Sequence, residues 1–166
     1  MKKIGIVSLI IIIFDRIFKE LVTNNLTLNV RNKVIDGFFY ITNCHNDGAA
    51  FSLFSGNVLF LILITLMVLY LIYKTIEKNN INKIGTISYG LLLGGILGNL
   101  FDRIFYGYVI DYLDFRIFNF NFAIFNLADM AIVIGAILLI VFEGSGNDGR
   151  KNKGRSRKLR KEWKNR

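Results

Sequence analysis

Three aspartates lie in or beside an aromatic-rich stretch, and two of them could form a catalytic pair. The stretch, GYVIDYLDFRIFNFNFAIFNLAD, spans residues 107 to 129 and contains Asp111, Asp114 and Asp129. The 17 residues between Asp111 and Asp129 are enough chain to turn back and bring the two together. Two carboxylates in a partly dry site cannot both ionise cheaply, so they share one proton. The ionised member can then take a proton from water while its partner polarises a peptide carbonyl.

Asn126 and Asp129 also fit a structural role. They are three residues apart and lie at the start of an apolar run. Asn at a helix N-cap, followed three residues later by an acid, resembles a capping arrangement and suits the helix dipole. The residues alone leave capping and catalysis open.

A second polar group ends the segment TISYGLLLGGILGNLFDRIFYGY. Its glycines at positions 90, 94 and 98 recur every four residues, which predicts a smooth stripe for close packing of another helix. Asp102 continues that spacing, and Asn99 and Arg103 lie four apart, one step round the helix. Both Asn99 and Arg103 can donate hydrogen bonds. The alternative is that Asp102 and Arg103 are an interfacial charge pair ending the helix.

The elements that must position these residues are apolar enough for a membrane. The chain of 166 residues is 53% hydrophobic, has a mean hydropathy of +0.45 and contains no proline. Such a composition is typical of an integral membrane protein, and a membrane-spanning helix needs about 20 mainly apolar residues. We therefore predict an all-α membrane bundle over residues 1–142, with helices at 4–22, 58–73, 84–105 and 124–142. A basic tail, residues 143–166, follows.

The first predicted helix begins like a secretory signal peptide, with two lysines before an apolar run. No small-x-small cleavage site follows, and charged residues come next at positions 15, 16, 19 and 20. We therefore predict that the helix is retained.

The distribution of lysine and arginine predicts the orientation, because short cytoplasmic loops carry the excess. Basic residues precede the first helix, separate the second from the third, and fill the tail. Both termini should therefore be cytoplasmic. Residues 23–57 and 106–123 should face outward, which places the candidate site near the outer face of the membrane.

The excess of positive charge, +9 for the whole chain, lies in the C-terminal tail. Residues 150–166 contain ten Lys and Arg against one Glu, whereas the rest of the chain is balanced. Beside a last membrane helix, such a run favours orientation and attraction to anionic lipid headgroups. No nucleic-acid recognition fold accompanies it, so we expect no nucleic-acid partner.

The single cysteine and single histidine argue against several other chemistries. Cys44 cannot form an intramolecular disulfide, and His45 without an HExxH motif or a cysteine cluster does not make a usual zinc site. A Cys44–His45 nucleophilic pair is disfavoured because neighbours on a strand point to opposite faces. There is no G-x-S-x-G motif. We expect no metal and no cofactor.

Five short blocks, in this order along the chain, resemble the bacterial lipoprotein signal peptidase family, also called signal peptidase II. The resemblance covers residues 1 to 142 and is carried by Asp15 with Lys19, NDGAAFS at 46–52, GGILGNLFDR at 94–103, VIDYLDF at 109–115 and FNLAD at 125–129.

The resemblance implies an aspartic endopeptidase of the cytoplasmic membrane. Its members cleave the signal peptide from prolipoproteins on the N-terminal side of a diacylglyceryl-modified cysteine. Asp111 and Asp129 would be the catalytic dyad. Further positions match family residues that line or brace the site: Asp15, Asn46, Asn99, Asp102, Arg103 and Asn126. At Gly48, close approach of a substrate strand and a simple tight turn both remain open.

The family fold also implies a small outward β-sheet, the cradle, supplied mainly by the loop after the first helix. Here residues 30–52 include KVIDGFFYITNCHNDGAAFS, whose β-branched and aromatic content suits strands, with a turn at Asp36–Gly37.

Departures from the family pattern fall outside the dyad. Arg16 stands where the family usually has Gln, and Met130 stands where a small hydroxyl residue is common. We expect both to affect pocket polarity or substrate tolerance, and His45 and Asp47 to tune the site beside Asn46.

Two rival functions remain open at this stage. A proton-coupled transporter would also hold Asp, Asn and Arg at membrane depth, although its site usually lies at the bilayer midplane. A non-catalytic scaffold would tolerate Asn at positions 111 and 129.

Overall fold

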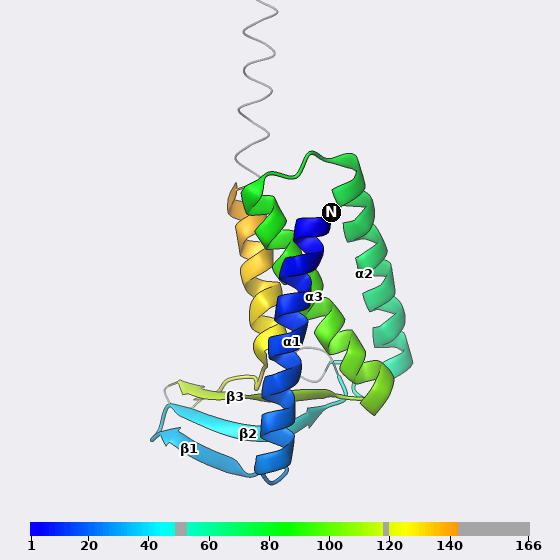
Figure 1. Ribbon diagram of the computed structural model, residues 1–166. Helices are drawn as coiled ribbons and strands as arrows, with labels where there is room; N and C mark the ends of the chain where they lie inside the picture. The colour runs from blue at the N-terminus through cyan, green and yellow to red at the C-terminus, as the bar shows by residue number, and fades with distance from the viewer. Residues whose placement is uncertain (49–52, 118–119, 143–166) are drawn as a thin grey trace, which may run out of the picture.

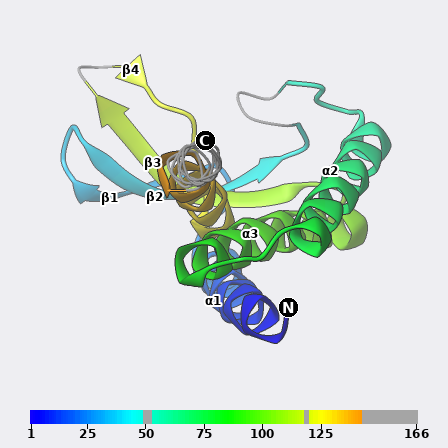
Figure 2. The same cartoon turned by 90° about the horizontal axis from the view of Figure 1, so that it is seen from above.

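The computed structural model describes residues 1–48, 53–117 and 120–142. The elements follow the order α1 (Lys2–Asn25), β1 (Arg31–Ile35), β2 (Phe39–Asn46), α2 (Val58–Lys78), α3 (Lys83–Tyr106), β3 (Val109–Ile117), β4 (Phe120–Asn121) and a C-terminal helix (Leu127–Phe142). The helices stand side by side as a bundle, and the sheet crosses one end of it (Figure 1). Figure 2 shows α3 between α2 on one side and α1 with the C-terminal helix on the other.

The predicted helices are all present among the described residues, with small shifts of their ends. By length and composition, α2 and α3 could each cross a membrane, whereas the C-terminal helix is shorter. The 24-residue α1 contains both acidic and basic residues in its second half. The helical bundle with a small sheet is thus as predicted, and the number of membrane crossings is taken up under the proposed function.

The polarity of this fold is inverted relative to a soluble protein. Its largest fully buried side chains are all polar: Lys19, Asn126, Asp15, Asp102, Asp114 and Ser88. Large apolar side chains such as Leu59 and Ile140 point outward instead, with 71% and 75% of their surface exposed. Since the core of a soluble domain is apolar, this arrangement indicates an apolar solvent around the helices.

The glycine stripe of α3 packs against α1, as predicted. A Cβ atom built on Gly90 would lie 2.5 Å from Val7 Cβ, and one on Gly94 would lie 2.8 Å from Ile11 Cβ. At Gly98 the added atom would meet Asp15 Oδ2 at 2.8 Å. Small residues therefore let the two helix backbones approach closely.

The start and end of α3 are both capped. Asn82 accepts a hydrogen bond from the Gly85 N–H at 2.7 Å. At the other end Gly107 adopts φ +77° and donates its N–H to the Arg103 carbonyl at 3.2 Å. This left-handed conformation suits glycine, and it turns the chain directly into β3, which carries Asp111.

The strands form one antiparallel sheet in the order β1-β2-β3-β4. The hairpin joining β1 and β2 turns at Asp36–Gly37, where Gly37 has φ +70°, as predicted. β3 was not predicted. It belongs to the second outward segment, so the sheet draws on both segments. Its first four residues are all buried, so it lacks the alternating pattern by which a strand is recognised.

Candidate active site

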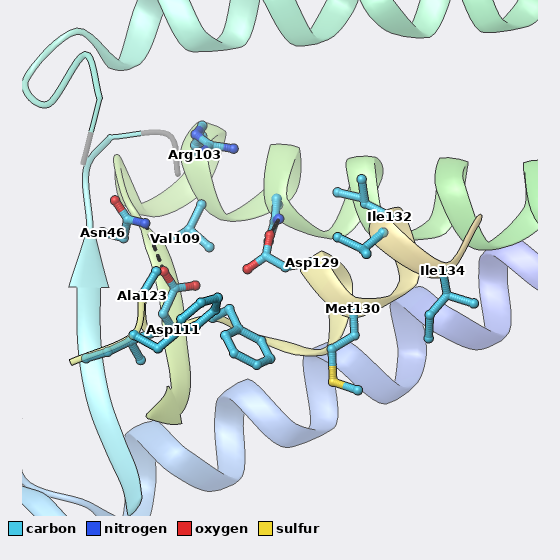
Figure 3. A pocket seen from close by; sticks show the side chains of 14 residues that line it. Asn46, Arg103, Val109, Asp111, Ala123, Asp129, Met130, Ile132 and Ile134 are labelled. Carbon is cyan, nitrogen blue, oxygen red and sulfur yellow. Dashed lines mark hydrogen bonds between the residues drawn. The ribbon is translucent and has the colours of Figure 1, made fainter. Parts of the chain in front are cut away.

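A cavity of about 660 Å³ lies between β3, α3 and the C-terminal helix. Its polar lining comes from four elements and comprises Asn46, Asn99, Arg103, Asp111 and Asp129. Its apolar wall includes Phe122, Phe125, Met130, Ile132 and Val133. Figure 3 shows the carboxylates of Asp111 and Asp129 turned toward the same space from β3 and the C-terminal helix.

Asn126 links the two aspartates. Its side-chain amide donates to Asp111 Oδ1 at 2.7 Å, and its backbone N–H donates to Asp129 Oδ2 at 3.1 Å. Its side-chain oxygen accepts from the Asp129 N–H at 2.9 Å. The reciprocal bonds between Asn126 and Asp129 form a capping box. The structure therefore shows that Asn126 caps the helix and contacts both aspartates.

Two further asparagines complete the contacts of the carboxylates. Asn46 on β2 donates to Asp111 Oδ2 at 2.9 Å, while its own oxygen accepts from the Gly48 N–H at 3.0 Å. Asn99 on α3 donates to Asp129 Oδ1 at 2.7 Å. Each carboxylate is thus held by neutral donors, which position it without adding a cation.

The surroundings of Asp111 favour its protonated form. It is 2% exposed, and its pKa is raised from 3.8 to about 7 by burial and, to a lesser extent, by the nearby charge of Asp129. Hydrogen bonds from Asn46 and Asn126 and the charge of Lys19 oppose this shift. Near neutral pH the Asp111 carboxyl can therefore hold a proton.

Arg103 and Gly48 connect α3 to the chain after β2. The Arg103 guanidinium lines the cavity and donates from Nη2 to the Gly48 carbonyl at 2.9 Å. It is also close enough to Asp111 and Asp129 to interact electrostatically with both. Gly48 itself is buried, and Ala49 and Ala50 lie outside the described residues.

A second group of charges, which we call the ion cluster, lies beside the cavity and comprises Asp15, Arg16, Lys19 and Asp102. The Lys19 ammonium is fully buried and lies 2.7 Å from Asp15 Oδ2 and 2.8 Å from Asp102 Oδ2. Arg16 Nη1 lies 2.8 Å from Asp102 Oδ1. Buried carboxylates are thus paired with buried or half-buried cations.

The ion cluster also supports the backbone next to Asp111 and next to Asp129. Asp102 Oδ2 accepts from the Ile110 N–H at 3.3 Å, and Ile110 directly precedes Asp111. Asp15 Oδ1 accepts from the Ala128 N–H at 3.1 Å, and Ala128 directly precedes Asp129. Asp15 and Asp102 therefore lie outside the cavity lining but hold the backbone at both aspartates.

Lys19 was not among the predicted site residues. The sequence feature that could identify it is its position four residues after Asp15, since residues four apart share a helix face. A lysine in an apolar helix also needs a carboxylate partner unless it can reach the interface.

Asp114 lies on β3 but does not line the cavity. It is fully buried, and its Oδ2 accepts from Arg31 Nε at 2.6 Å and from Thr42 Oγ1 at 3.1 Å. Because Arg31 is on β1 and Thr42 is on β2, Asp114 joins three strands of the sheet.

The structure shows the surroundings of the two departures from the family pattern and of the two residues beside Asn46. Met130 lines the cavity, whereas Arg16 belongs to the ion cluster and packs over Phe101 and Tyr106. His45 stacks on Tyr108 at 3.8 Å between ring centroids, and burial lowers its pKa. Asp47 is exposed and accepts from Ser55 and from the Gly56 N–H.

Cys44 pairs with Asp111 across β2 and β3. Burial raises the pKa of its thiol, and the charges of Asp111 and Asp114 raise it further. A thiol in this setting stays protonated, so the site favours carboxylate chemistry over a cysteine nucleophile.

Comparison with known proteins connects this geometry to a family. The sequence profile described as "Signal peptidase (SPase) II" matches residues 7–143. The chain is 42% identical over 137 residues to a lipoprotein signal peptidase of Halothermothrix orenii, covering 82% of this chain and 92% of that protein. It is 36% identical to the lipoprotein signal peptidase of Bacillus pumilus, covering 82% of this chain and 88% of the relative.

Solved structures agree with the sequence relatives. A bacterial membrane enzyme determined by the in meso method at 2.3 Å resolution matches with a TM-score of 0.80 at 31% identity, covering 90% of this chain and 92% of the other. A second bacterial membrane enzyme, determined by the same method at 1.9 Å, matches with a TM-score of 0.75 at 33% identity, covering 85% and 92%. The chain therefore belongs to the signal peptidase II family of bacterial membrane proteases that process lipoproteins.

Proposed function

We propose that this protein is an aspartic endopeptidase whose catalytic dyad is Asp111 and Asp129. The observation that carries the proposal is the position of Asn126, which donates to a carboxylate oxygen of each aspartate at 2.7 and 3.1 Å. Both carboxylates line one cavity. The arrangement supports shared-proton chemistry of the kind used by paired aspartates.

In the proposed mechanism, one aspartate is ionised and the other carries a proton. The ionised carboxylate takes a proton from water as the water oxygen attacks the scissile carbonyl carbon, while the protonated carboxyl donates to the carbonyl oxygen. The tetrahedral gem-diol intermediate then collapses: one hydroxyl returns its proton to the second aspartate as the carbonyl re-forms, the C–N bond breaks, and the amine leaves with the proton that the first aspartate took from water. No covalent enzyme intermediate forms.

We further propose that the substrate is a prolipoprotein, cut on the N-terminal side of a diacylglyceryl-modified cysteine. The apolar wall of the cavity supports this proposal, because Val133 and Ile134 on the C-terminal helix line the cavity and are also exposed on the outer surface. Acyl chains in the surrounding lipid can therefore reach the cavity wall directly. Anchoring the substrate in the bilayer would supply proximity to the dyad.

The proposed topology has four membrane crossings with both termini in the cytoplasm. In support, the start of α1, the α2–α3 connection and the end of the C-terminal helix gather at one end of the bundle, and the sheet lies at the other (Figure 1). The basic residues between α2 and α3 lie at the first end. The dyad, on β3 and the first turn of the C-terminal helix, would then lie near the outer face.

The remaining proposed partners are membrane lipids. Residues 143–166 lie outside the described residues, and their ten Lys and Arg between positions 150 and 166 are proposed to attract anionic headgroups. We propose no nucleic-acid partner and no metal or cofactor.

The experiment that tests the function is cleavage of a purified diacylglyceryl-modified prolipoprotein in lipid. Wild type should cut the modified substrate and leave its unmodified form intact. Asp111→Asn and Asp129→Asn should abolish cleavage while remaining folded, and Asp36→Asn, an exposed aspartate of the same sheet, should cut normally. Cleavage by either dyad variant would contradict the assigned dyad, and cleavage of the unmodified substrate would contradict the lipid requirement.

A further inference from the structure

The Lys19 ammonium has a third contact, which leads toward the dyad. Besides Asp15 and Asp102, it donates to Asn99 Oδ1 at 3.1 Å. An ammonium group has three protons, so these contacts use all of them. The side chain is fully buried, and no proton is left for solvent.

This contact fixes the orientation of the Asn99 amide. Because an ammonium group can donate but cannot accept, the atom facing Lys19 must be the amide oxygen. The Asn99 oxygen also accepts from Asn126 Nδ2 at 3.1 Å. The Asn99 nitrogen is therefore left to face Asp129, to which it donates at 2.7 Å.

The same contact polarises the amide. A positive charge at the oxygen draws electron density away from the nitrogen, and chains of hydrogen bonds strengthen one another in a low-dielectric interior. The Asn99 N–H is consequently a stronger donor to Asp129 than an isolated amide. A stronger donor favours the ionised form of the carboxylate that accepts from it.

Among the described residues, Asp111 has no such relay of hydrogen bonds, and the charge of Lys19 acts on it only through space. Its donors, Asn46 and Asn126, accept in turn from backbone N–H groups of Gly48 and Asp129, which carry no full charge. Asp129 also lies in the first turn of the C-terminal helix and accepts from a backbone N–H there, where the helix dipole favours a negative charge.

The other titratable or charged groups facing the dyad do not reverse this difference. From α3, Arg103 interacts with both aspartates, and Asp102 is paired with Lys19 and Arg16. From α1, Asp15 is paired with Lys19. From the sheet, burial raises the pKa values of the Cys44 thiol and the Tyr112 phenol, so both remain neutral.

We infer that Lys19 is a positioning residue that acts through the Asn99 amide to hold Asp129 as the ionised base, which leaves the shared proton on Asp111. The inference rests on the proposed dyad. It assigns Asp129 to proton abstraction from water and Asp111 to proton donation to the substrate carbonyl.

The test is the pH dependence of kcat/KM for cleavage of the diacylglyceryl-modified substrate. Removing Lys19 alone would leave Asp15 short of a cation, so the comparison is Asp15→Asn against Asp15→Asn/Lys19→Met. The acidic limb, which reports ionisation of the base, should move to higher pH by about one unit in the double variant. Lys74→Met removes an exposed lysine that pairs with Glu77, and it should leave the limb in place.

Asn99→Ala supplies a second variant that leaves the contacts of Lys19 to both carboxylates of the ion cluster in place. It should move the acidic limb in the same direction, and in the Asp15→Asn/Lys19→Met protein it should cause a smaller shift than in the Asp15→Asn protein, because the Asn99 amide is then no longer polarised by Lys19. A merely structural role for Lys19 would lower the rate at every pH and leave the limb where it is.

The failures of the two proposals can be told apart. An acidic limb that stays in place, or activity lost at every pH in both Lys19 and Asn99 variants, would overturn the relay, since a residue that only biases the proton leaves turnover at higher pH. Cleavage by Asp111→Asn or Asp129→Asn would overturn the dyad itself.

Discussion

Two pairs of carboxylates lie side by side in this protein, and they differ in what lies between them. Asp15 and Asp102 are joined by the Lys19 ammonium at 2.7 and 2.8 Å. Asp111 and Asp129 are joined by Asn126, whose side-chain and backbone N–H groups donate at 2.7 and 3.1 Å. One pair is bridged by a cation and the other by neutral amides.

This difference separates a structural site from the proposed chemical one. The Lys19 ammonium pairs with both carboxylates of the ion cluster, which suits the cluster to holding the backbone at Ile110 and Ala128. Neutral donors place no cation between Asp111 and Asp129, which favours a shared proton in the proposed dyad. The ion cluster holds the backbone beside both aspartates and so positions the proposed dyad.

The largest expected effect follows from removing the cationic bridge. Lys19→Met leaves Asp15 and Asp102 buried with one shared partner fewer, and we expect a loss of about 3–5 kcal/mol in the free energy of unfolding. Denaturant titration in detergent micelles measures this loss. Lys74→Met, at an exposed pair, should change stability by less than about 0.5 kcal/mol. Equal stability of the two variants would contradict the account of the ion cluster.

At Asp111 we expect the stability of the folded state to fall as the pH rises. Burial raises the pKa of Asp111 from 3.8 to about 7, so the folded state binds its proton more tightly than the unfolded state. Stability is therefore lost as the pH rises from about 4 to about 7, and wild type should lose about 2–3 kcal/mol between pH 5 and 8 through this group.

Asp111→Asn should remove that loss, because the substituted side chain does not titrate. Unfolding curves of both proteins at pH 5 and 8 provide the measurement. If the variant showed the same drop as wild type, another group would be responsible and the assignment to Asp111 would be wrong.

A smaller effect on stability, with a large effect on activity, is expected from Asn126→Ala. Loss of the N-cap should cost about 1 kcal/mol, while loss of the donor to Asp111 should lower kcat by about 100-fold. Asn82→Ala removes a similar cap on α3, where Asn82 accepts from the Gly85 N–H, and should cost similar stability with normal kcat. Equal kcat in the two variants would show that Asn126 acts only as a helix cap.

The smallest expected effect concerns Arg16, one of the two departures from the family pattern. Its side chain is 23% exposed and pairs with Asp102, which keeps Lys19 as a partner in any case. Arg16→Gln should therefore cost about 1 kcal/mol or less, measured by unfolding beside Glu20→Gln, whose exposed carboxylate pairs weakly with Arg16. A loss as large as that of Lys19→Met would mean that Arg16 is the main cation of the cluster.

Apolar runs were sufficient to predict the helices. The predicted ranges 58–73 and 84–105 begin within one residue of α2 (Val58–Lys78) and α3 (Lys83–Tyr106). The end of α2 was placed too early because charged residues there suggested a loop, whereas Lys74 and Glu77 pair three residues apart on the helix. β3 was missed because both of its faces are buried, which removes the alternation of apolar and polar residues.

The sequence was less informative about how polar residues meet. The resemblance named Asp111, Asp129 and Asn126, but the spacing alone could not separate capping from catalysis, and the structure shows that Asn126 takes part in both contacts. The spacing links Lys19 only to Asp15, because its other partner, Asp102, is 83 residues away along the chain. Contacts between distant helices depend on packing, and the glycine stripe of α3 gave only the face on which they occur.

The central claim is that the dyad works with one proton, and the direct test is the pH dependence of kcat/KM for the wild-type protein on its diacylglyceryl-modified substrate. Because the pKa of Asp111 is raised to about 7, cleavage should fall as the pH rises through about 7, with a tenfold loss per pH unit beyond it. At lower pH, protonation of the second carboxylate should give an acidic limb. A rate that stays constant or rises up to about pH 9 would show that no shared proton is needed and would contradict the account.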